Sequence, residues 1–202
     1  MNDYSIFLRA FEPDDYLLIN KWRNDKKIQE KTMGLIRYVS TEMEKVWAHD
    51  KMLNNTKEIY LAICSIDTKE MVGYVSINNI DLINRKADGG GIVIGNEIYR
   101  NGKTLIDTSL LLFEHVFDHL GLNRYSGVCL ETHIDSRIMM EIMGFRLEGI
   151  ELESVYKFHK YHNACKYVLL ASDYYRILSE NGYSELAVAK RAKVLKNKLK
   201  NN

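Results

Sequence analysis

The chain has 202 residues, 46% hydrophobic and 27% charged, which is enough for one globular domain with a substantial core. Six of the 28 basic residues follow position 189, and the other 22 basic and 27 acidic residues give the body a net charge of −5. An acidic body argues against a nucleic-acid groove and slightly favours an amino-bearing ligand. No stretch approaches the ~20 apolar residues of a membrane span, and no signal-peptide pattern is present, which predicts a cytoplasmic protein.

Three cysteines, Cys64, Cys129 and Cys165, are odd in number and lack a C-x-x-C spacing. Cys64 and Cys129 lie inside apolar, strand-like runs. The pattern predicts buried free thiols in a reducing compartment, and no metal site is expected.

The N-terminal part predicts one strand and two helices. Apolar residues over 6–11 predict a strand that ends before Pro13, the only proline. A helix follows over residues 14–25. A second helix is expected from Ser40 or Thr41, with Glu44 completing a capping box.

The middle of the chain predicts an antiparallel meander. Residues 59–66 and 71–77 form two expected strands joined by a turn at 67–70. Residues 91–94 form a third. The glycines at 89–91 before it indicate a turn, with a β-bulge as the alternative.

A strongly apolar helix is expected over residues 105–120, capped by Thr104 with Asp107 and closed by Gly121 in a left-handed conformation. A strand through Val128 and Leu130 comes next.

The remaining segments complete a mixed α/β pattern. Residues 134–143 predict a short helix that Gly144 ends, after which Phe145 turns inward. A β-rich stretch over 161–170 and a C-terminal helix follow.

The lysine-rich C-terminal helix carries an apolar stripe opposite its basic residues. The stripe consists of Leu186, Ala189, Ala192, Leu195 and Leu199, and the basic face of Lys190, Arg191, Lys193, Lys196 and Lys200. Packing on the domain, on a second subunit or on an anionic surface would each satisfy this pattern.

One motif resembles a known family. The residues are His133-x-x-Ser136-x-x-x-x-Glu141-x-x-Gly144-Phe145. They match four of five positions of the pattern N-x-x-S-x-x-x-x-E-x-x-G-F, which closes the domain in the ribosomal-protein-acetylating branch of the GNAT superfamily of N-acetyltransferases. The resemblance runs from Ile6 to about Tyr175, and it implies an acetyltransferase domain over 1–175 with a basic amphipathic tail over 176–202.

The resemblance implies the fold and the co-substrate. The fold would be α/β, a mixed and mainly antiparallel twisted sheet with a splayed central strand pair, helices on both faces and an extra C-terminal helix. Acetyl-CoA would bind with its pantetheine arm along the splayed strand and its pyrophosphate at a helix N-terminus. The strand would be Ile92, Val93 and Ile94.

The family's pyrophosphate loop is R/Q-x-x-G-x-G/A, and this chain departs from it. Counted without gaps, Arg100 takes the first position, but Lys103 and Leu105 stand on the glycine positions. One inserted residue lets Gly102 and Thr104 take those positions. Either the loop still wraps the pyrophosphate or it no longer accepts it. The expected cofactor-binding residues are Arg100, Asn101, Gly102, Lys103, Thr104 and Leu105, together with His133 and Ser136.

Acetyl transfer needs a base for the amine and a proton donor for the departing thiolate. By resemblance, Ser136 is the donor, because Met140 stands where other superfamily members use a tyrosine. Glu131 is the preferred base, with His133 and Asp88 as alternatives. The non-catalytic alternatives are that Ser136 is an ordinary residue of the first helical turn and that Glu131 is a solvated carboxylate at the helix start. His133 replaces an asparagine that contacts the cofactor in the family.

The acceptor would be a small-molecule or peptide amine. The run Trp22-Arg23-Asn24-Asp25 recurs in relatives that acetylate amino sugars or protein N-termini, and Tyr161-His162-Asn163 resembles an element of polyamine acetyltransferases. Trp22, Arg23, Asp88 and His162 are therefore the expected substrate-binding residues. Trp22 as a core residue and His162 as strand surface are the structural alternatives. A homodimer is possible, and a non-catalytic acyl-CoA-binding or structural protein is the competing hypothesis.

Overall fold

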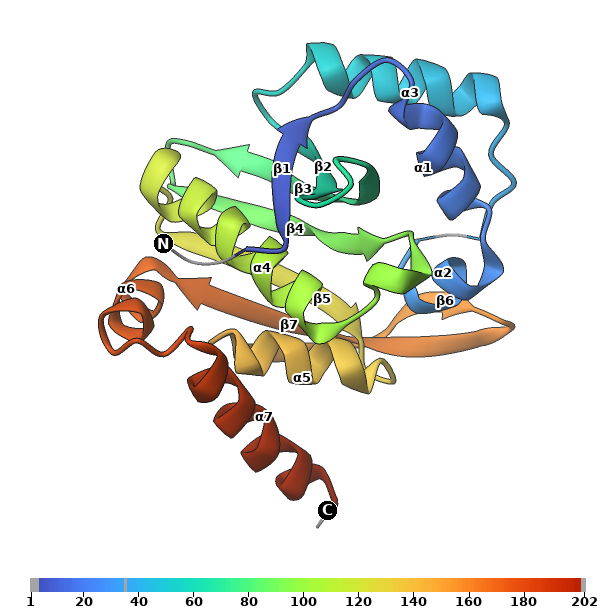
Figure 1. The fold of residues 1–202 in the computed structure, drawn as a ribbon. Helices are drawn as coiled ribbons and strands as arrows, with labels where there is room; N and C mark the ends of the chain where they lie inside the picture. The colour runs from blue at the N-terminus through green and yellow to red at the C-terminus, as the bar shows by residue number, and fades with distance from the viewer. Residues whose placement is uncertain (1–3, 35, 201–202) are drawn as a thin grey trace. The chain divides into compact units, whose positions relative to one another are not determined.

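The chain divides into two compact units, residues 1–121 and 122–202. The computed structural model describes residues 4–34 and 36–200, with side chains up to residue 195 (Figure 1). Within those ranges, no helix has both the length and the apolarity needed to cross a bilayer.

The first unit is built on four strands in chain order, each antiparallel to the next. They are β1 (Ile6–Ala10), β2 (Ile59–Ser65), β3 (Met71–Asp81) and β4 (Lys86–Ile94). Its α-helices are α1 (Asp15–Arg23), α2 (Lys26–Lys31), α3 (Thr41–Leu53) and α4 (Gly102–Phe113). A 3-10 turn (Glu97–Tyr99) precedes α4, and a π-helical segment (Glu114–His119) extends it.

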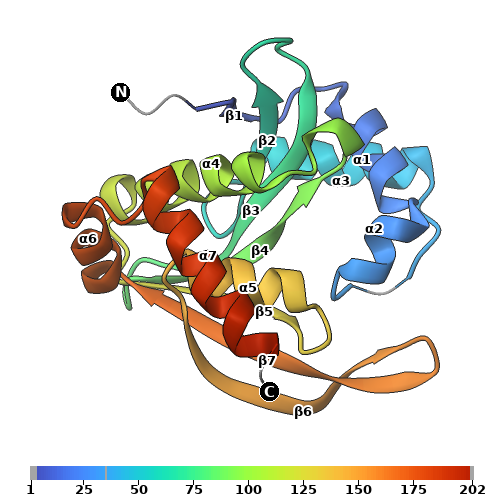
Figure 2. The ribbon, with the colours of Figure 1, turned by 60° about the horizontal axis from the view of Figure 1, so that its bottom comes forward.

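The second unit places β7 between β5 and β6, again with antiparallel pairing. The strands are β5 (Arg124–Leu130), β6 (Arg146–Lys157) and β7 (Lys160–Leu170), and the helices are α5 (Ile134–Ile142), α6 (Ala171–Ser179) and α7 (Glu185–Lys200). Figure 2 shows β6 and β7 as a long hairpin, and α7 contacts α5.

Strand residues supply most of the core of each unit. Ile63, Val72 and Val75 are fully buried in the first unit, and Tyr167 and Leu169 in the second. Branched and aromatic side chains fill a pleated surface well, which explains why these segments form strands. All three cysteines are buried and free, as the sequence predicts.

Three glycine predictions have clear outcomes. Gly121 and Gly144 adopt φ of 59° and 95°, so both end their helices in the left-handed region as expected. The preferred turn at Gly89–Gly91 is wrong, because these residues belong to β4. The pairing jumps from Val75–Ile92 to Ile77–Gly89, which is the alternative bulge.

Two predicted helix caps are wrong. Helix α4 begins at Gly102, because the Asn101 side chain accepts the N–H of Thr104 at 2.9 Å; Thr104 and Asp107 lie inside the helix. Ser40 caps α3 as expected, by accepting the N–H of Met43 at 3.2 Å. Glu44 does not complete a capping box, since it is buried and lies 3.0 Å from Arg23.

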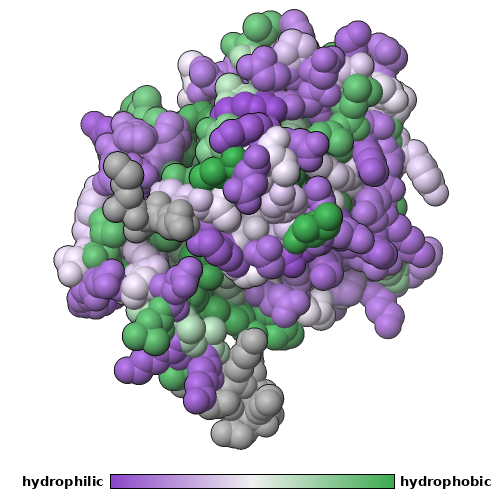
Figure 3. All heavy atoms as spheres, in the orientation of Figure 1, coloured by the Kyte–Doolittle hydropathy of each residue, from purple (hydrophilic) through white to green (hydrophobic). Residues whose placement is uncertain are grey.

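Helices α2 and α6 were not expected from the sequence. The C-terminal stripe is also shifted, because Leu186 and Ala189 are exposed while Val188 is buried. The side chains of Leu199, Lys196 and Lys200 lie outside the described residues. Arg191 donates from Nε to the carbonyl of Ile142 at 2.8 Å and thereby ties α7 to α5. Figure 3 shows hydrophobic residues gathered beside α7.

Replacing Gly144 tests the turn that ends α5. A Cβ there would lie 2.4 Å from Ile177 Cδ1, on a residue with a positive φ. We expect Gly144→Ala to lower the free energy of unfolding by about 1–3 kcal/mol in urea titrations. Gly149→Ala is the control, because a Cβ at that site meets nothing within 4 Å. Equal stability of the two variants would contradict this account.

Candidate active site

Arg100 fixes the end of β4. Its Nε donates to the carbonyl of Ile94 and an Nη donates to the carbonyl of Gly95, both at 2.9 Å. The guanidinium also lies 3.3 Å from Glu97 and 3.8 Å from Asp25. Most of its donors are thus directed at the protein, and Arg100 acts on this loop by setting the course of its backbone.

The three expected pantetheine residues form the last part of β4. Ile92, Val93 and Ile94 pair with Val75, Tyr74 and Gly73 of β3, respectively. A Cβ at Gly73 would lie 2.3 Å from the carbonyl oxygen of Val93, so only glycine allows this close approach. Because β3 occupies one edge, a pantetheine arm would have to use groups on the opposite edge of β4.

The expected pyrophosphate loop is the N-terminus of α4. Asn101 caps the helix, and a Cβ at Gly102 would meet no atom within 4 Å, so there is open space beside this residue. Lys103 Nζ lies 3.4 Å from the carboxylate of buried Asp107, while Thr104 is itself buried. The first amides of a helix point out of its N-terminal end, so the loop presents backbone donors although Lys103 and Leu105 stand on the glycine positions of an ungapped loop.

Trp22 and Arg23 lie in an aromatic cluster of the first unit. Trp22 is 5% exposed, and a Cβ at Gly95 would lie 2.0 Å from its indole ring, so the indole packs directly on the exit of β4. The guanidinium of Arg23 lies 3.7 Å above the Trp47 ring and pairs with fully buried Glu44. Trp22 has little surface left for a ligand, whereas the Arg23 side chain keeps 28% exposure.

Burial raises the pKa of Glu44, and the positive charge of Arg23 opposes that rise. Apart from this ion pair, the two carboxylate oxygens have no hydrogen-bond partner among the described residues. A buried carboxylate with one charged partner depends strongly on that partner. Glu44 therefore holds Arg23 in place, and the charge of Arg23 favours the ionised form of Glu44 against the effect of burial.

Asp88 lies on the exposed face of β4 in the first unit. Its Oδ2 accepts a hydrogen bond from Asn79 Nδ2 at 2.9 Å. Nearby, a Cβ at Gly90 would lie 1.9 Å from Ser76 Oγ, so the bulge brings the backbone against β3. Asp88 is an anchored surface carboxylate in this unit.

In the second unit, Glu131 is anchored by Asn163 of β7. Its Oε2 accepts from Asn163 Nδ2 at 2.8 Å, and its N–H donates to the Asn163 carbonyl at 2.9 Å. Arg137 Nη1 donates to the carbonyl of Glu131 at 3.2 Å. The carboxylate is partly exposed and oriented by an amide, which is a geometry that a base can use.

His133 and Ser136 begin α5. The carbonyl of His133 accepts the N–H of Ser136 at 3.1 Å, so His133 occupies the N-cap position, where its side chain makes no capping hydrogen bond. The side chain of Ser136 contacts the thiol of buried Cys129. Burial raises the pKa of this thiol, and the contact with Ser136 opposes that rise. Glu131 and His133 thus lie on the short connection between β5 and α5, and Ser136 lies in the first turn of α5.

A series of polar contacts beneath α5 was not predicted from the sequence. Arg137 Nε donates to the hydroxyl of Tyr167 at 3.4 Å, and that hydroxyl donates to Glu141 at 3.3 Å. Burial raises the pKa of Tyr167, so the hydroxyl remains a donor at neutral pH. These hydrogen bonds give the motif residue Glu141 a physical role, because they attach α5 to β7. Only the arginine and glutamate at i and i+4 of α5 gave a sequence signal.

His162 lies on β7 in the hairpin with β6. One ring nitrogen, Nε2, lies 3.1 Å from the carbonyl oxygen of Lys157, which β6 contributes. The imidazole therefore spans the hairpin. Its expected role in acceptor binding stays a prediction.

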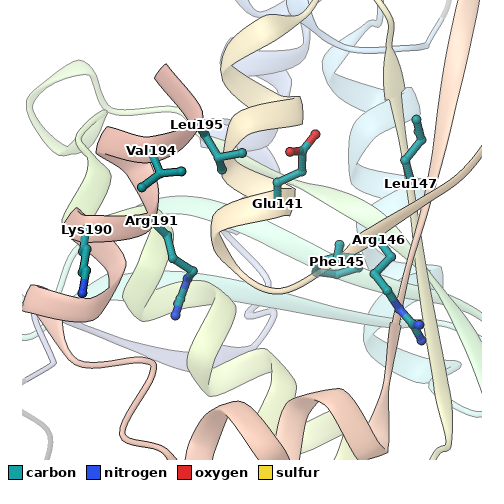
Figure 4. A pocket seen from close by; sticks show the side chains of 8 residues that line it. All are labelled: Glu141, Phe145, Arg146, Leu147, Lys190, Arg191, Val194 and Leu195. Carbon is teal, nitrogen blue, oxygen red and sulfur yellow. The ribbon is translucent and has the colours of Figure 1, made fainter. Parts of the chain in front are cut away.

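A groove of about 620 Å³ lies between α7, α5 and the start of β6. Figure 4 shows Val194 and Leu195 of α7 on one side and Phe145 and Leu147 on the other, with Glu141 of α5 between them. Its lining is mostly apolar and includes none of the expected catalytic residues. The groove is thus a feature of the α7 packing.

The Acetyltransferase (GNAT) domain model matches residues 5–146. The chain belongs to the GNAT acetyltransferase family. No curated protein is similar enough in sequence to match this GNAT chain.

Solved structures support the GNAT fold. A spermidine N-acetyltransferase from Vibrio cholerae, solved with CoA and spermine, has a TM-score of 0.77 at 20% identity and covers 85% of this chain and 98% of its own. A probable acetyltransferase has a TM-score of 0.74 at 22% identity, covering 85% and 96%. A GNAT-family acetyltransferase from Bacillus anthracis has a TM-score of 0.71 at 17% identity, covering 83% and 96%. The expected α/β GNAT fold is confirmed.

Removing Arg23 tests its pairing with Glu44. Burial raises the folded-state pKa of Glu44 above its ordinary 4.5. The contribution of Glu44 to the free energy of unfolding therefore falls as pH rises from about 4.5 through the folded-state pKa. Without Arg23 the folded pKa rises further. We expect Arg23→Gln to be about 3 kcal/mol less stable than wild type at pH 8, with a smaller deficit at pH 5, measured by urea unfolding.

The double variant Arg23→Gln, Glu44→Gln is the matched control, because it removes the buried charge as well. The double variant should recover part of the stability lost in Arg23→Gln. Its stability deficit should be the same at pH 5 and pH 8, because no buried carboxylate is left to titrate. Equal deficits of Arg23→Gln at pH 5 and pH 8 would show that Glu44 is not a buried, titrating partner.

Proposed function

We propose that this GNAT protein transfers the acetyl group of acetyl-CoA to a primary amine. The observation that carries the proposal is the capped N-terminus of α4 with open space at Gly102, directly after the pinned end of β4. Backbone amides at a helix N-terminus suit a pyrophosphate. Backbone N–H groups are present at this N-terminus whichever side chains the loop carries, which supports the proposal.

The chemistry would be direct attack of a neutral amine on the thioester. Glu131 takes the proton of the amine, directly or through water, since Asn163 orients its carboxylate. Ser136 returns a proton to the departing thiolate. Val93 and Ile94 would lie along the pantetheine arm, with backbone amides directed at the developing oxyanion. His133 is the alternative base.

We further propose the ribosomal-protein-acetylating type within the family. Ser136, Glu141, Gly144 and Phe145 match its motif, and Glu141 and Gly144 have structural roles on α5 that the motif would require. Met140 covers Gly127, where a Cβ would lie 2.9 Å from Met140 Cε, so this position packs on β5 and supplies no phenol.

The acceptor is proposed to be an amine that also carries negative charge, such as a nucleotide-linked amino sugar. In relatives, the loops after the Trp22–Asp25 run line the acceptor pocket. Here residues 21–37 contain six basic and two acidic side chains, and Arg23 is held partly exposed by Glu44. A segment with this excess of basic side chains would repel a polycation and attract phosphate. Spermidine is therefore the less suitable acceptor, although a structural neighbour acetylates it.

Residues 1–175 would form the acetyltransferase domain and 176–202 the tail. The three free cysteines agree with a cytoplasmic location. A homodimer stays a prediction.

Substitution of the expected base and acid tests the mechanism. We expect Glu131→Gln and Ser136→Ala each to lower kcat by about 10²–10⁴-fold in an assay of thiol release, with acetyl-CoA affinity nearly unchanged. Glu148→Gln, which removes only an exposed pair with Arg124, should keep wild-type kcat. Unchanged turnover in both site variants would refute the assigned roles.

A non-catalytic acyl-CoA-binding protein is the second candidate, favoured by Lys103 and Leu105 on the glycine positions of an ungapped loop. Calorimetric titration with acetyl-CoA separates the possibilities. Binding with no thiol release from any amine would support this candidate, whereas no binding at millimolar acetyl-CoA would exclude both.

An acceptor panel tests the charge argument. We expect a nucleotide-linked amino sugar to have at least tenfold higher kcat/KM than spermidine at low ionic strength, with the difference shrinking as salt rises. The double variant Lys27→Glu, Arg37→Glu should lower the ratio of kcat/KM for the amino sugar to kcat/KM for spermidine. Lys160→Glu on the β6–β7 hairpin should leave this ratio unchanged. A wild-type preference for spermidine would overturn the proposed acceptor class.

A further inference from the structure

Two histidines lie one turn apart at the end of α4, among residues that the proposed reaction does not use. His115 and His119 belong to the π-helical segment, and their Nδ1 atoms lie 3.3 Å apart. The ring centroids are 5.5 Å apart, with the planes inclined at 75°. The two Nδ1 atoms therefore face one another in a hydrogen bond between the rings.

This spacing is the one that two imidazole ligands of a tetrahedral ion adopt. Zinc–nitrogen bonds of about 2.0–2.1 Å at a tetrahedral angle place the two nitrogens about 3.3–3.4 Å apart. Histidines at positions i and i+4 of one helix face are a recurring pair of zinc ligands. Chelation would replace the hydrogen bond between the rings with one bond from each Nδ1 to the ion.

The surroundings of the pair favour a cation. The pair lies at the C-terminal end of its helix, where the macrodipole is negative. Its sequence neighbours Glu114 and Asp118 are acidic and exposed. His119 is exposed and His115 half-buried, so an ion can reach both from solvent.

We propose that His115 and His119 form a binding site for one borderline divalent ion, Zn²⁺ or Ni²⁺. In the part of the chain that the structure describes, no group of three or more histidine, cysteine, aspartate or glutamate side chains could hold a metal. The site is therefore a two-histidine chelate whose other positions are filled by water. Mg²⁺ prefers oxygen ligands and is not bound.

Calorimetric titration of the untagged, metal-free, full-length protein at pH 7.5 tests this proposal. Wild type should bind one Zn²⁺ or one Ni²⁺ per chain, and saturating ion should raise its unfolding temperature. His119→Gln should bind at least tenfold more weakly. His119 is exposed, so the metal-free variant should unfold at the wild-type temperature.

His49→Gln is the matched control, because His49 is an exposed helix histidine on α3. It should bind both ions with wild-type affinity, and Mg²⁺ should give no heat with any of the proteins. Failure of wild type to bind Zn²⁺ and Ni²⁺, or wild-type affinity in His119→Gln, would overturn the proposal. Acetyl-CoA titrations are independent of either result.

Discussion

The attachment of Arg100 to the carbonyls of Ile94 and Gly95 is the contact on which the first half of the candidate site depends. A strand that runs into a helix must turn while its carbonyls stay satisfied, and a planar guanidinium with several fixed donors can satisfy two of them at once. Trp22 closes the same turn by packing on Gly95. The end of β4 and the start of α4 are thus positioned by side chains that need not contact a ligand.

The second unit solves a similar problem by close approach and buried polar contacts. The helix α5 carries Ser136, and it lies close to β5 because Gly127 leaves room for Met140. Below it, Tyr167 joins Arg137 to Glu141, so one hydroxyl of β7 links two positions of the helix. A motif that reads as catalytic in sequence therefore contains at least one residue, Glu141, that holds the helix in place.

Elements with strong periodicity or a glycine stop were predictable, including β1 to β3, α5 and the ends at Gly121 and Gly144. What failed has a common physical cause, since tertiary contacts decided it. Glu44 has the sequence context of a capping residue but is buried as the partner of Arg23, and Gly89–Gly91 look like a turn but form a bulge against Ser76. The motif pointed to His133 and Ser136 as candidate site residues, and Glu131 was chosen for its place at a strand end; the roles of all three stay predictions. The contacts of Tyr167 and Asn163 had no local signal, because both residues come from a strand 25 or more residues away.

The departure from the glycine loop shows why a pattern of side chains is an incomplete guide to a backbone site. Glycines in such a loop matter because they let the chain approach an anion, while the donors are amides that every residue except proline carries. Asn101 starts α4 three residues before the sequence suggested, and this shift places Gly102, not Lys103 or Leu105, at the first helical position. Thr104 points into the core, so its side chain occupies none of the space in front of the helix. Thr104 is therefore accommodated within the protein, and the Lys103 ammonium lies 3.4 Å from the carboxylate of Asp107.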